Sequence, residues 1–378
     1  MKTYLQTVDL ENFRNVEKTC LSFDRDLTIL YGDNAQGKTN VVEAVYLFAT
    51  GKSFRGARDR DMIRFGSERA RVCLTYSDRL RDNEMEYRFF SEESRKKREI
   101  SVNHVKMKSV GQMIGRFRAV LFCPEHLSIV KDEPSLRRNF LDHAICQLKP
   151  TYVQALTEYA KILDQRNALM RDFEQYPPEQ WDSLLAVLNE TFADTASFIT
   201  VTRAKYLKKL FDFADRYMRD MTGEREKLSY SYLNSVDDRE NPDDFDFAGI
   251  RKRYAEKLTC RIEREKLAGV SLCGAHRDDF SILLNEKAAK LFASQGQQRS
   301  IALAMKLAEG ELSMEYAGDY PVFLLDDVMS ELDRKRKDYI LSGFGDRQII
   351  LTTCDKNDFA SCKNAMKIET KNGTFSVS

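Results

Sequence analysis

The segment Gly32–Thr39 constrains this 378-residue chain more than any other feature. It reads Gly-Asp-Asn-Ala-Gln-Gly-Lys-Thr, follows the apolar run Leu27–Tyr31 directly, and precedes a stretch, Asn40–Thr50, that is apolar nearly all round. A strand, a glycine-rich turn and a buried helix in that order are typical of a phosphate-binding P-loop. Backbone N–H groups of such a turn surround phosphate oxygens, and the helix N-terminus adds its dipole. The sequence therefore predicts an α/β unit that binds a nucleoside triphosphate.

The last two residues of that string have predicted chemical roles of their own. Lys38 is expected to reach the β- and γ-phosphates, and Thr39 to offer its hydroxyl to Mg²⁺. With ATP as the nucleotide, the predicted ligands are Gly32, Asp33, Asn34, Ala35, Gln36, Gly37, Lys38, Thr39 and Asn40. We therefore expect ATP and Mg²⁺ as cofactors and count Lys38 among the catalytic groups.

The run Tyr320–Asp327 supplies a partner for the P-loop. Val322–Leu325 is an apolar strand, and two carboxylates, Asp326 and Asp327, stand at its carboxyl end. Ligands of open α/β sheets bind beyond the carboxyl ends of the strands. Asp326 is therefore predicted to hold Mg²⁺ through its water shell together with Thr39, and Asp327 to orient or deprotonate the attacking water.

Charge and composition narrow the class of protein. Lys and Arg number 60 against 59 Asp and Glu, so a net charge of +1 gives no global attraction to nucleic acid. The eight cysteines lack C-x-x-C spacing and only four histidines are present, which favours reduced, mostly buried thiols. No stretch approaches the ~20 apolar residues of a membrane helix, and the N-terminus lacks the apolar run of a signal peptide. We expect a cytoplasmic protein without membrane contact.

Strand-like and helical patterns divide the chain into two units. Strand-like runs are Tyr4–Leu10, Ala70–Tyr76, Met85–Phe90, Ala119–Cys123, Phe280–Leu284, Gln348–Thr353 and Met366–Glu369. Helical spacing dominates the middle, in 151–170, in 181–221 as one long helix or two joined ones, and in 251–267. We predict one α/β domain built from both chain ends, 1–125 and 270–378, interrupted by a helical lobe at 126–269.

Two further strings have more than one interpretation from their residues alone. Ser294–Ser300 precedes a helical Ile301–Glu311, so Ser294 and Gly296 are expected where a helix begins and its free N–H groups face outward. His276–Asp279 places a histidine beside two aspartates, which could bind a metal as in a nuclease. We favour a structural role for that string, because no partner cluster of ligands is visible elsewhere.

Taken in order, these strings resemble the ABC-type ATPase heads of the SMC-like group, and the RecF family most closely. The residues that carry the resemblance are Leu10–Asn15, the P-loop with Asn40, Gly51–Arg55, Leu121–Glu125, Pro134–Asp142, Gly274–Asp279, Ser294–Arg299 and Leu324–Asp333. They cover almost the whole chain. The resemblance implies an α/β, ABC-type P-loop ATPase head built from both chain ends with an inserted helical lobe.

The resemblance also assigns roles in an assembly. Ser294–Gln297 looks like the ABC signature, in which Ser294, Gly296 and Gln297 of one subunit would contact the γ-phosphate held by the other. Ser330–Asp333 matches the D-loop, which meets the partner subunit. ATP would then join two heads into a homodimer, because two helix N-termini share its negative charge.

Three departures from the general ABC pattern bear on the rate of hydrolysis. Gln295 replaces a glycine of the transporter signature, Asp327 replaces the glutamate of many ABC ATPases, and Leu351–Asp355 holds no switch histidine. No Q-loop glutamine is identified near Phe122–Glu125. These departures favour a slow, weak ATPase, stimulated by DNA, that acts as a dimerisation switch.

RecF-like proteins bind double-stranded DNA and single-strand gap junctions in an ATP-dependent manner, and they aid recombinase loading with RecO and RecR. The resemblance implies sequence-independent DNA binding and RecR/RecO-like partners in recombinational repair and replication. Basic clusters compatible with phosphate contact are Arg95–Arg98, Lys106, Lys108, Arg251–Arg253, Lys205, Lys208 and Lys209. Glutamates interleave, so each cluster is equally typical of a solvated face. No helix-turn-helix or zinc-finger string predicts base-specific readout.

Other functions stay open at the level of sequence. The alternatives are another SMC-like ATPase, or a P-loop kinase or GTPase that does not act on gapped DNA. The signature-like and D-loop strings argue against the kinase, and the absence of N-K-x-D against the GTPase. A structural SMC protein would need long heptads between the head halves. A transporter subunit is disfavoured by the built-in lobe.

Overall fold

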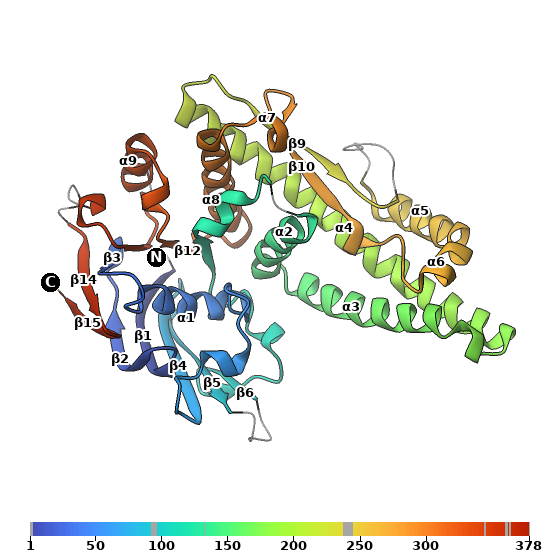
Figure 1. Cartoon of the computed structure of the whole chain (residues 1–378), viewed down its shortest axis with the longest axis horizontal. Coiled ribbons are helices and arrows are strands. Elements are labelled where there is room, and N and C mark those ends of the chain that lie inside the picture. The colour runs from blue at the N-terminus through green and yellow to red at the C-terminus, as the bar shows by residue number, and fades with distance from the viewer. Residues whose placement is uncertain are drawn as a thin grey trace.

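A mostly parallel sheet joins the two ends of the chain (Figure 1). The computed structural model describes residues 3–91, 97–131, 133–236, 245–343, 345–359, 362 and 364–377. The strand order is β15-β14-β3-β13-β12-β8. The strands are β3 (Leu27–Tyr31), β8 (Ala119–Phe122), β12 (Val322–Asp326), β13 (Ile349–Thr353), β14 (Met366–Lys371) and β15 (Thr374–Val377). Only β15 is antiparallel, and Asp326 of β12 lies opposite Thr352 of β13.

A second, antiparallel sheet lies beside it in the order β2-β1-β4-β5-β6-β7. Its strands are β1 (Tyr4–Phe13), β2 (Val16–Ser22), β4 (Arg69–Ser77), β5 (Asp82–Phe90), β6 (Arg98–Val102) and β7 (Val105–Lys106). Helix α1 (Lys38–Thr50) shares one apolar core with both sheets, and all its residues except Thr39 are buried. This position between two sheets explains why the sequence of α1 is apolar nearly all round.

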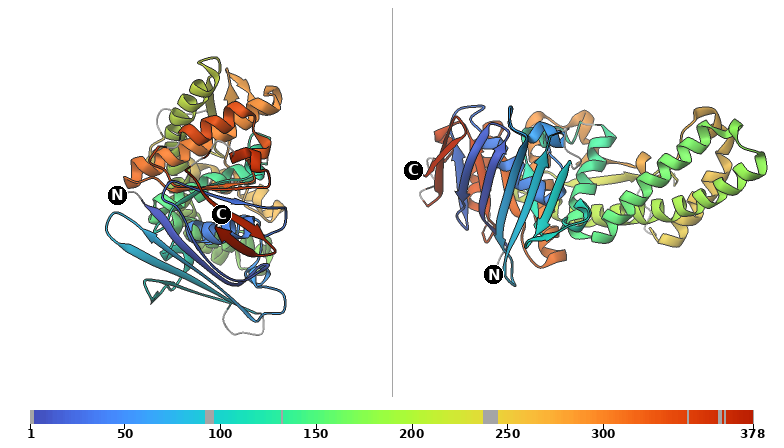
Figure 2. Two further views of the ribbon diagram at one scale, coloured as in Figure 1. Left: turned by 90° about the vertical axis from the view of Figure 1, so that its left-hand side faces the viewer. Right: turned by 90° about the horizontal axis from the view of Figure 1, so that it is seen from below.

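The predicted helical region forms an elongated lobe that projects from the two sheets (Figure 2, right). Its helices are α2 (Pro134–Leu148), α3 (Pro150–Arg171), α4 (Pro178–Thr222), α5 (Phe247–Cys260) and α6 (Ile262–Ala268). The open question about 181–221 is resolved in favour of one 45-residue helix, α4. The helix predicted over 251–267 is interrupted, because Arg261 leaves helical geometry between α5 and α6.

Helix α4 corrects one expectation about membranes. By length and composition alone it could cross a bilayer, which the sequence had not suggested. Half of its apolar window is buried inside the structure, where α4 packs against α3, α5 and α8. Its apolar stripe is therefore used as core in this fold.

A small sheet and three more helices connect lobe and head. The sheet has the order β11-β10-β9, from β9 (Leu228–Leu233), β10 (Asp279–Leu284) and β11 (Lys287–Ala288). The helices are α7 (Ala289–Phe292), α8 (Gln295–Ala317) and α9 (Arg334–Gly343). Short 3-10 helices are η1 (Asp59–Met62), η2 (Val110–Gln112), η3 (Pro124–Ser128), η4 (Phe173–Gln175), η5 (Ala275–Arg277), η6 (Met329–Glu331) and η7 (Lys356–Phe359). Because β9 pairs with β10, this sheet crosses the division proposed at 269/270.

Candidate nucleotide site

The P-loop joins β3 to α1 in the backbone conformation that its glycines permit. Gly32 has φ 147° and Gly37, which caps α1, has φ 117°, values that L-residues rarely adopt. A methyl group on Gly32 would lie 2.3 Å from the carbonyl oxygen of Thr370 in β14. The Lys38 ammonium donates to the carbonyl oxygens of Gly32 and Asp33 at 2.7 and 2.8 Å. The loop thus closes around a buried cation, as phosphate binding requires.

Segments distant in sequence hold the outside of this loop. Gly373, between β14 and β15, donates its N–H to the carbonyl of Gln36 at 2.9 Å. Asn15 donates to the carbonyl of Ala35 at 3.3 Å and accepts from the Asn40 amide at 2.6 Å. The sequence of the C-terminal hairpin predicts no role in a site, since none of its residues carries a recognisable signal. Asp33 and Asn34, by contrast, have exposed side chains.

Asp326 lies against the P-loop. The sequence predicted that these two segments, from opposite ends of the chain, would meet. Thr39 Oγ1 donates to Asp326 Oδ1 at 3.1 Å, and Thr352 Oγ1 donates to the same oxygen at 2.7 Å. Burial raises the pKa of Asp326, the two hydroxyl donors oppose that rise, and the charge of Asp327 adds to it. Such a buried carboxylate gains from a nearby cation. The sequence did not predict a role for Thr352. Its position at the end of β13 was the available signal, because a parallel strand paired with β12 would end beside Asp326.

Asp327 is the first residue beyond β12 and has φ 52°. Its N–H donates to Thr352 Oγ1 at 3.0 Å, which fixes this left-handed turn. Burial raises the pKa of its carboxyl, and the Lys38 ammonium opposes that rise. A non-glycine residue held in this region at the edge of a site stores strain of about 1–3 kcal/mol. The Asp327 carboxylate is therefore near Lys38, and the surrounding packing must stabilise its strained backbone.

A buried glutamate anchors the helix that follows the P-loop. Glu43 of α1 is fully buried and accepts two hydrogen bonds from Arg14, at 2.9 and 2.6 Å. Ser53 donates a further hydrogen bond to it, and Arg55 lies 3.8 Å away. The strings Leu10–Asn15 and Gly51–Arg55, which carried part of the family resemblance, therefore meet at one carboxylate. Their role in this structure is to position α1.

The signature-like string begins helix α8 at a different place. Ser294 Oγ accepts from the Gln297 N–H at 3.3 Å, and the Gln297 side chain accepts from the Ser294 N–H at 2.7 Å. Gln297 also donates to Glu226 at 2.7 Å. Figure 1 shows α8 beginning beside α7, away from α1. Ser294, Gly296 and Gln297 are thus not brought to the P-loop of their own chain, which agrees with a contribution in trans.

The D-loop string lies between these two places. Ser330 Oγ donates to the carbonyl of Asp327 at 3.0 Å. Glu331 pairs with Arg299 of α8 at 2.6 Å, and Arg336 of α9 donates to the carbonyl of Gly296 at 2.9 Å. One short segment therefore contacts both the end of β12 and the first turn of α8.

The string Gly274–Asp279 is structural in its surroundings. Asp278 is fully buried and accepts from Tyr232 and Thr200, each at 2.8 Å, and from the Ser235 N–H at 3.0 Å. Asp279 receives two hydrogen bonds from Arg137 of α2, at 2.8 and 2.7 Å. Within the described part of the chain, no group of three His, Cys, Asp or Glu could hold a metal. These contacts favour the structural interpretation over the nuclease one.

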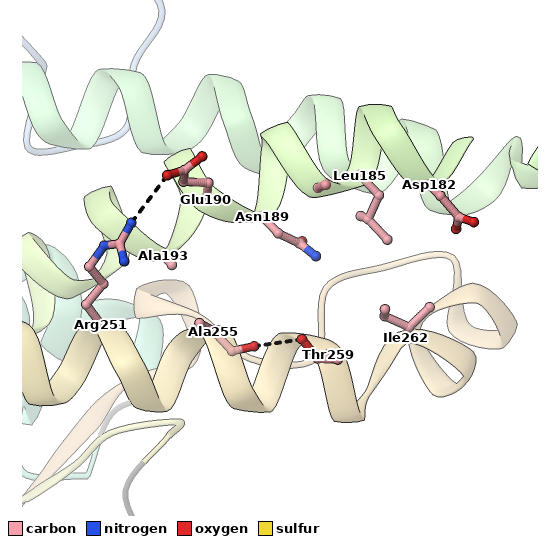
Figure 3. Close-up of a pocket in the computed structure, with 10 residues that line it drawn as sticks. Asp182, Leu185, Asn189, Glu190, Ala193, Arg251, Ala255, Thr259 and Ile262 are labelled. Carbon is pink, nitrogen blue, oxygen red and sulfur yellow. Dashed lines mark hydrogen bonds and ion pairs between the residues drawn. The ribbon is translucent and has the colours of Figure 1, made fainter. Parts of the chain in front are cut away.

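Several of the predicted basic clusters are neutralised by neighbours. Arg251 pairs with Asp194 and lies 3.6 Å from Glu190, over a groove of about 430 Å³ between α4 and α5 (Figure 3). Lys106 pairs with Glu99 at 2.9 Å. Arg95 and Lys96 lie outside the described residues. Lys205 and Lys208 of α4 are exposed, which leaves that cluster as the best phosphate-binding candidate from sequence.

Comparisons with known proteins agree with this geometry. The model of the RecF/RecN/SMC N-terminal domain matches residues 4–376. The DNA replication and repair protein RecF of Ruminiclostridium cellulolyticum is 37% identical over 362 residues, which is 94% of each chain. The solved structure of the recombination mediator protein RecF with ATP in the RecFOR pathway has a TM-score of 0.90 and 32% identity, covering 100% of this chain and 99% of that one.

A more distant structure shares the fold alone. The Smc head domain of Pyrococcus furiosus has a TM-score of 0.57 at 14% identity, covering 100% of this chain and 96% of that one. The predicted fold class, an α/β ABC-type head built from both chain ends, is confirmed by these likenesses and by the sheet that joins β3, β8, β12 and β13.

Proposed function

This chain belongs to the RecF family of DNA replication and repair proteins, and from that premise we propose that it is an ATP-driven dimerisation switch that binds DNA. In this proposal it binds duplex DNA and single-strand gap junctions in the cytoplasm, without base specificity. It aids recombinase loading with RecO- and RecR-like mediators. The observation that carries the proposal is the hydrogen bond between Thr39 and Asp326, which brings the P-loop and the end of β12 together.

ATP and Mg²⁺ fit the donor set of this site. The backbone of Gly32–Thr39 and the Lys38 ammonium would hold the phosphates, and the loop has no room for a side chain at Gly32. Thr39 and Asp326 are hard oxygen donors, and two such ligands suit Mg²⁺, which keeps several waters and binds phosphate oxygens as well. Bound Mg²⁺ would neutralise phosphate charge.

The residues of this chain have distinct proposed roles in hydrolysis. Asp327 would orient the attacking water and accept its proton, and its raised pKa matches it to that task. Lys38 would stabilise charge on the β- and γ-phosphates. Asp327 is one methylene shorter than glutamate, so it would reach less far, and we expect turnover below about 10 s⁻¹, the usual median for enzymes.

The switch depends on a second copy of the chain. Ser294, Gly296 and Gln297 would approach the γ-phosphate held by the partner, because α8 begins at an exposed Ser294 that caps the helix. The D-loop at Ser330–Asp333 would move with Asp327 when the phosphates change. Hydrolysis would then remove the shared anion and separate the two copies.

Sedimentation velocity tests this proposal. With ATP and Mg²⁺, the wild-type chain is expected to dimerise, Lys38→Met to stay monomeric with weak ATP affinity, and Asp327→Asn to remain dimeric for longer. Ser294→Arg is the diagnostic variant, because it should lose the dimer while one chain still binds ATP. Failure of every variant and of the wild type to dimerise, with or without duplex DNA, removes the switch. Phosphoryl transfer to a small molecule would favour the kinase alternative.

A further inference from the structure

A cluster of basic side chains surrounds the last turn of α8, at Ser313–Gly318. We call it the α8-end cluster; its members are Arg79, Arg118, Lys149, Lys205 and Lys209. A methyl group on Gly318 would lie 2.9 Å from Arg79 Nη1, and Arg118 Nε donates to Ser313 Oγ at 3.1 Å. The Lys149 and Lys209 ammonium groups lie 5.3 and 4.8 Å from the centre of the Tyr316 ring.

The cluster comes from four separate segments of the chain. Arg79 lies in the turn between β4 and β5, Arg118 precedes β8, Lys149 joins α2 to α3, and the remaining two lie on α4. The β4–β5 turn is ordered by Asp78, which accepts from the N–H groups of Leu80 and Arg81 at 2.7 and 3.0 Å. Figure 2 shows the N-terminal end of the described chain at the same end of α8, where Thr3 bonds to Asp319.

One acidic group near the cluster neutralises a member, and another is bonded outside the cluster. Glu315 pairs with Lys209, and Asp319 accepts from the N–H and hydroxyl of Thr3 at 2.8 and 2.5 Å. Burial lowers the pKa of Lys149, and the charges of Lys205 and Lys209 lower it further. Burial likewise lowers the pKa of Arg118, and Arg79 adds to that effect while Asp319 and Asp78 oppose it. These cations repel one another.

Stabilisation of the helix end accounts for only part of this cluster. A helix C-terminus carries roughly half a negative charge, which one or two cations neutralise. Glu315 neutralises Lys209, and the four other members, which come from four segments, still exceed that need. Exposed Tyr316 lies against two of the ammonium groups, so the surface combines positive charge with an accessible ring.

We infer that the α8-end cluster is the surface that contacts the phosphates of duplex DNA. This inference rests on the proposed DNA-binding function and names its site. It extends the Lys205–Lys209 group of the sequence analysis by cations that only the fold brings together. Duplex DNA presents phosphates at regular intervals, so cations on several separate elements can each contact one. Each such contact releases counterions independently of the others.

The salt dependence of DNA binding tests the inference. The variant Arg79→Ala/Lys149→Ala/Lys205→Ala removes three members and spares Arg118, which bonds to Ser313. The matched control, Lys18→Ala/Arg88→Ala/Lys161→Ala, removes the same charge from exposed positions elsewhere. Anisotropy of a fluorescein-labelled duplex is measured with ATP between about 50 and 200 mM salt. ATP-dependent sedimentation and circular dichroism verify that each variant folds.

The expected result is a change in slope. If all three side chains contact phosphates, the slope of log affinity against log salt falls in magnitude by about 2.7, and the control changes it by less than about 1. Equal slopes for the two variants would overturn the inference while leaving DNA binding intact. Displacement of duplex by polyglutamate of equal charge would overturn it in favour of an acidic protein. A wild-type chain that binds no duplex overturns the proposed function as well.

Discussion

The buried contact between Arg14 and Glu43 offers the sharpest test of how the P-loop helix is held. In Arg14→Ala, the fully buried Glu43 carboxylate loses two hydrogen bonds, of 2.9 and 2.6 Å, and its nearest cation. Removing one partner of a buried ion pair costs about 3–5 kcal/mol. The Ser53 hydroxyl remains, and Arg55, 3.8 Å away with 46% of its side chain exposed, can shift toward Glu43. We therefore expect the lower end, about 3 kcal/mol.

Urea unfolding followed by circular dichroism measures that loss. With an m value of about 3 kcal/mol per M, the midpoint falls by about 1 M. The control Arg64→Ala removes an exposed pair with Glu17 at 3.1 Å and should cost less than about 1 kcal/mol. Arg14→Met/Glu43→Leu removes both charges and should recover most of the stability. A midpoint for Arg14→Ala close to that of the wild type, or a double variant as unstable as the single one, would refute this reasoning.

Three further perturbations follow from the same site and its surroundings. Gly32→Ala should weaken ATP binding at least tenfold in a calorimetric titration, because its methyl group meets Thr370, whereas Gly56→Ala, at φ 70° with nothing within 4 Å, should not. Burial raises the pKa of Asp326, so its carboxyl stays protonated to a higher pH in the native state than in the unfolded chain. The free energy of unfolding therefore falls as pH rises from the pKa of this group in the unfolded chain to its pKa in the native state. Asp326→Asn should remove this slope and be at least as stable as the wild type at neutral pH without nucleotide; earlier unfolding in urea would contradict it. Burial lowers the pKa of His143 and of His276 to about 4, so both must gain a proton on unfolding in acid. The free energy of unfolding should therefore decrease as pH falls from ~6.5 toward 4. In urea titrations over this pH range, His276→Asn should show a smaller decrease than the wild type.

The residues next to the phosphates could be predicted from sequence because their signal is local. The P-loop lies on consecutive residues after an apolar strand, and Asp326 ends another apolar strand, so strand pairing alone brings them together. The supporting groups could not be predicted in this way. Asn15 contacts the loop from the turn between β1 and β2, Thr370 meets it from β14, and Thr352 of β13 contacts Asp326. Their residue types are common everywhere in the chain.

The strings that carried the family resemblance show a related limit. The sequences of Pro134–Asp142 and Gly274–Asp279 indicate the family. They do not indicate what these two segments do in the fold. In the structure Arg137 pairs directly with Asp279, and Arg203 of α4 bridges the two strings by pairing with Asp142 and donating to the carbonyl of Ala275. Buried ion pairs form between residues more than 60 positions apart, and no periodicity in the sequence encodes such a partner choice. The same holds for β9, whose alternating Leu228–Leu233 was not recognised as a strand within the helical lobe.

In the proposed dimer, the segment from Asp327 to Arg336 would link the two nucleotide sites that one chain serves. Its first residue stands at the end of β12 beside the P-loop of its own chain, on left-handed backbone. Its last residue donates to the carbonyl of Gly296, in the first turn of the helix that would face the partner's nucleotide. Between them, Glu331 holds Arg299 at 2.6 Å. Because packed elements change between discrete arrangements rather than deforming freely, we expect a shift of strained Asp327 to be transmitted to α8 over these contacts. We therefore propose that this segment couples the two half-sites of a chain in the dimer.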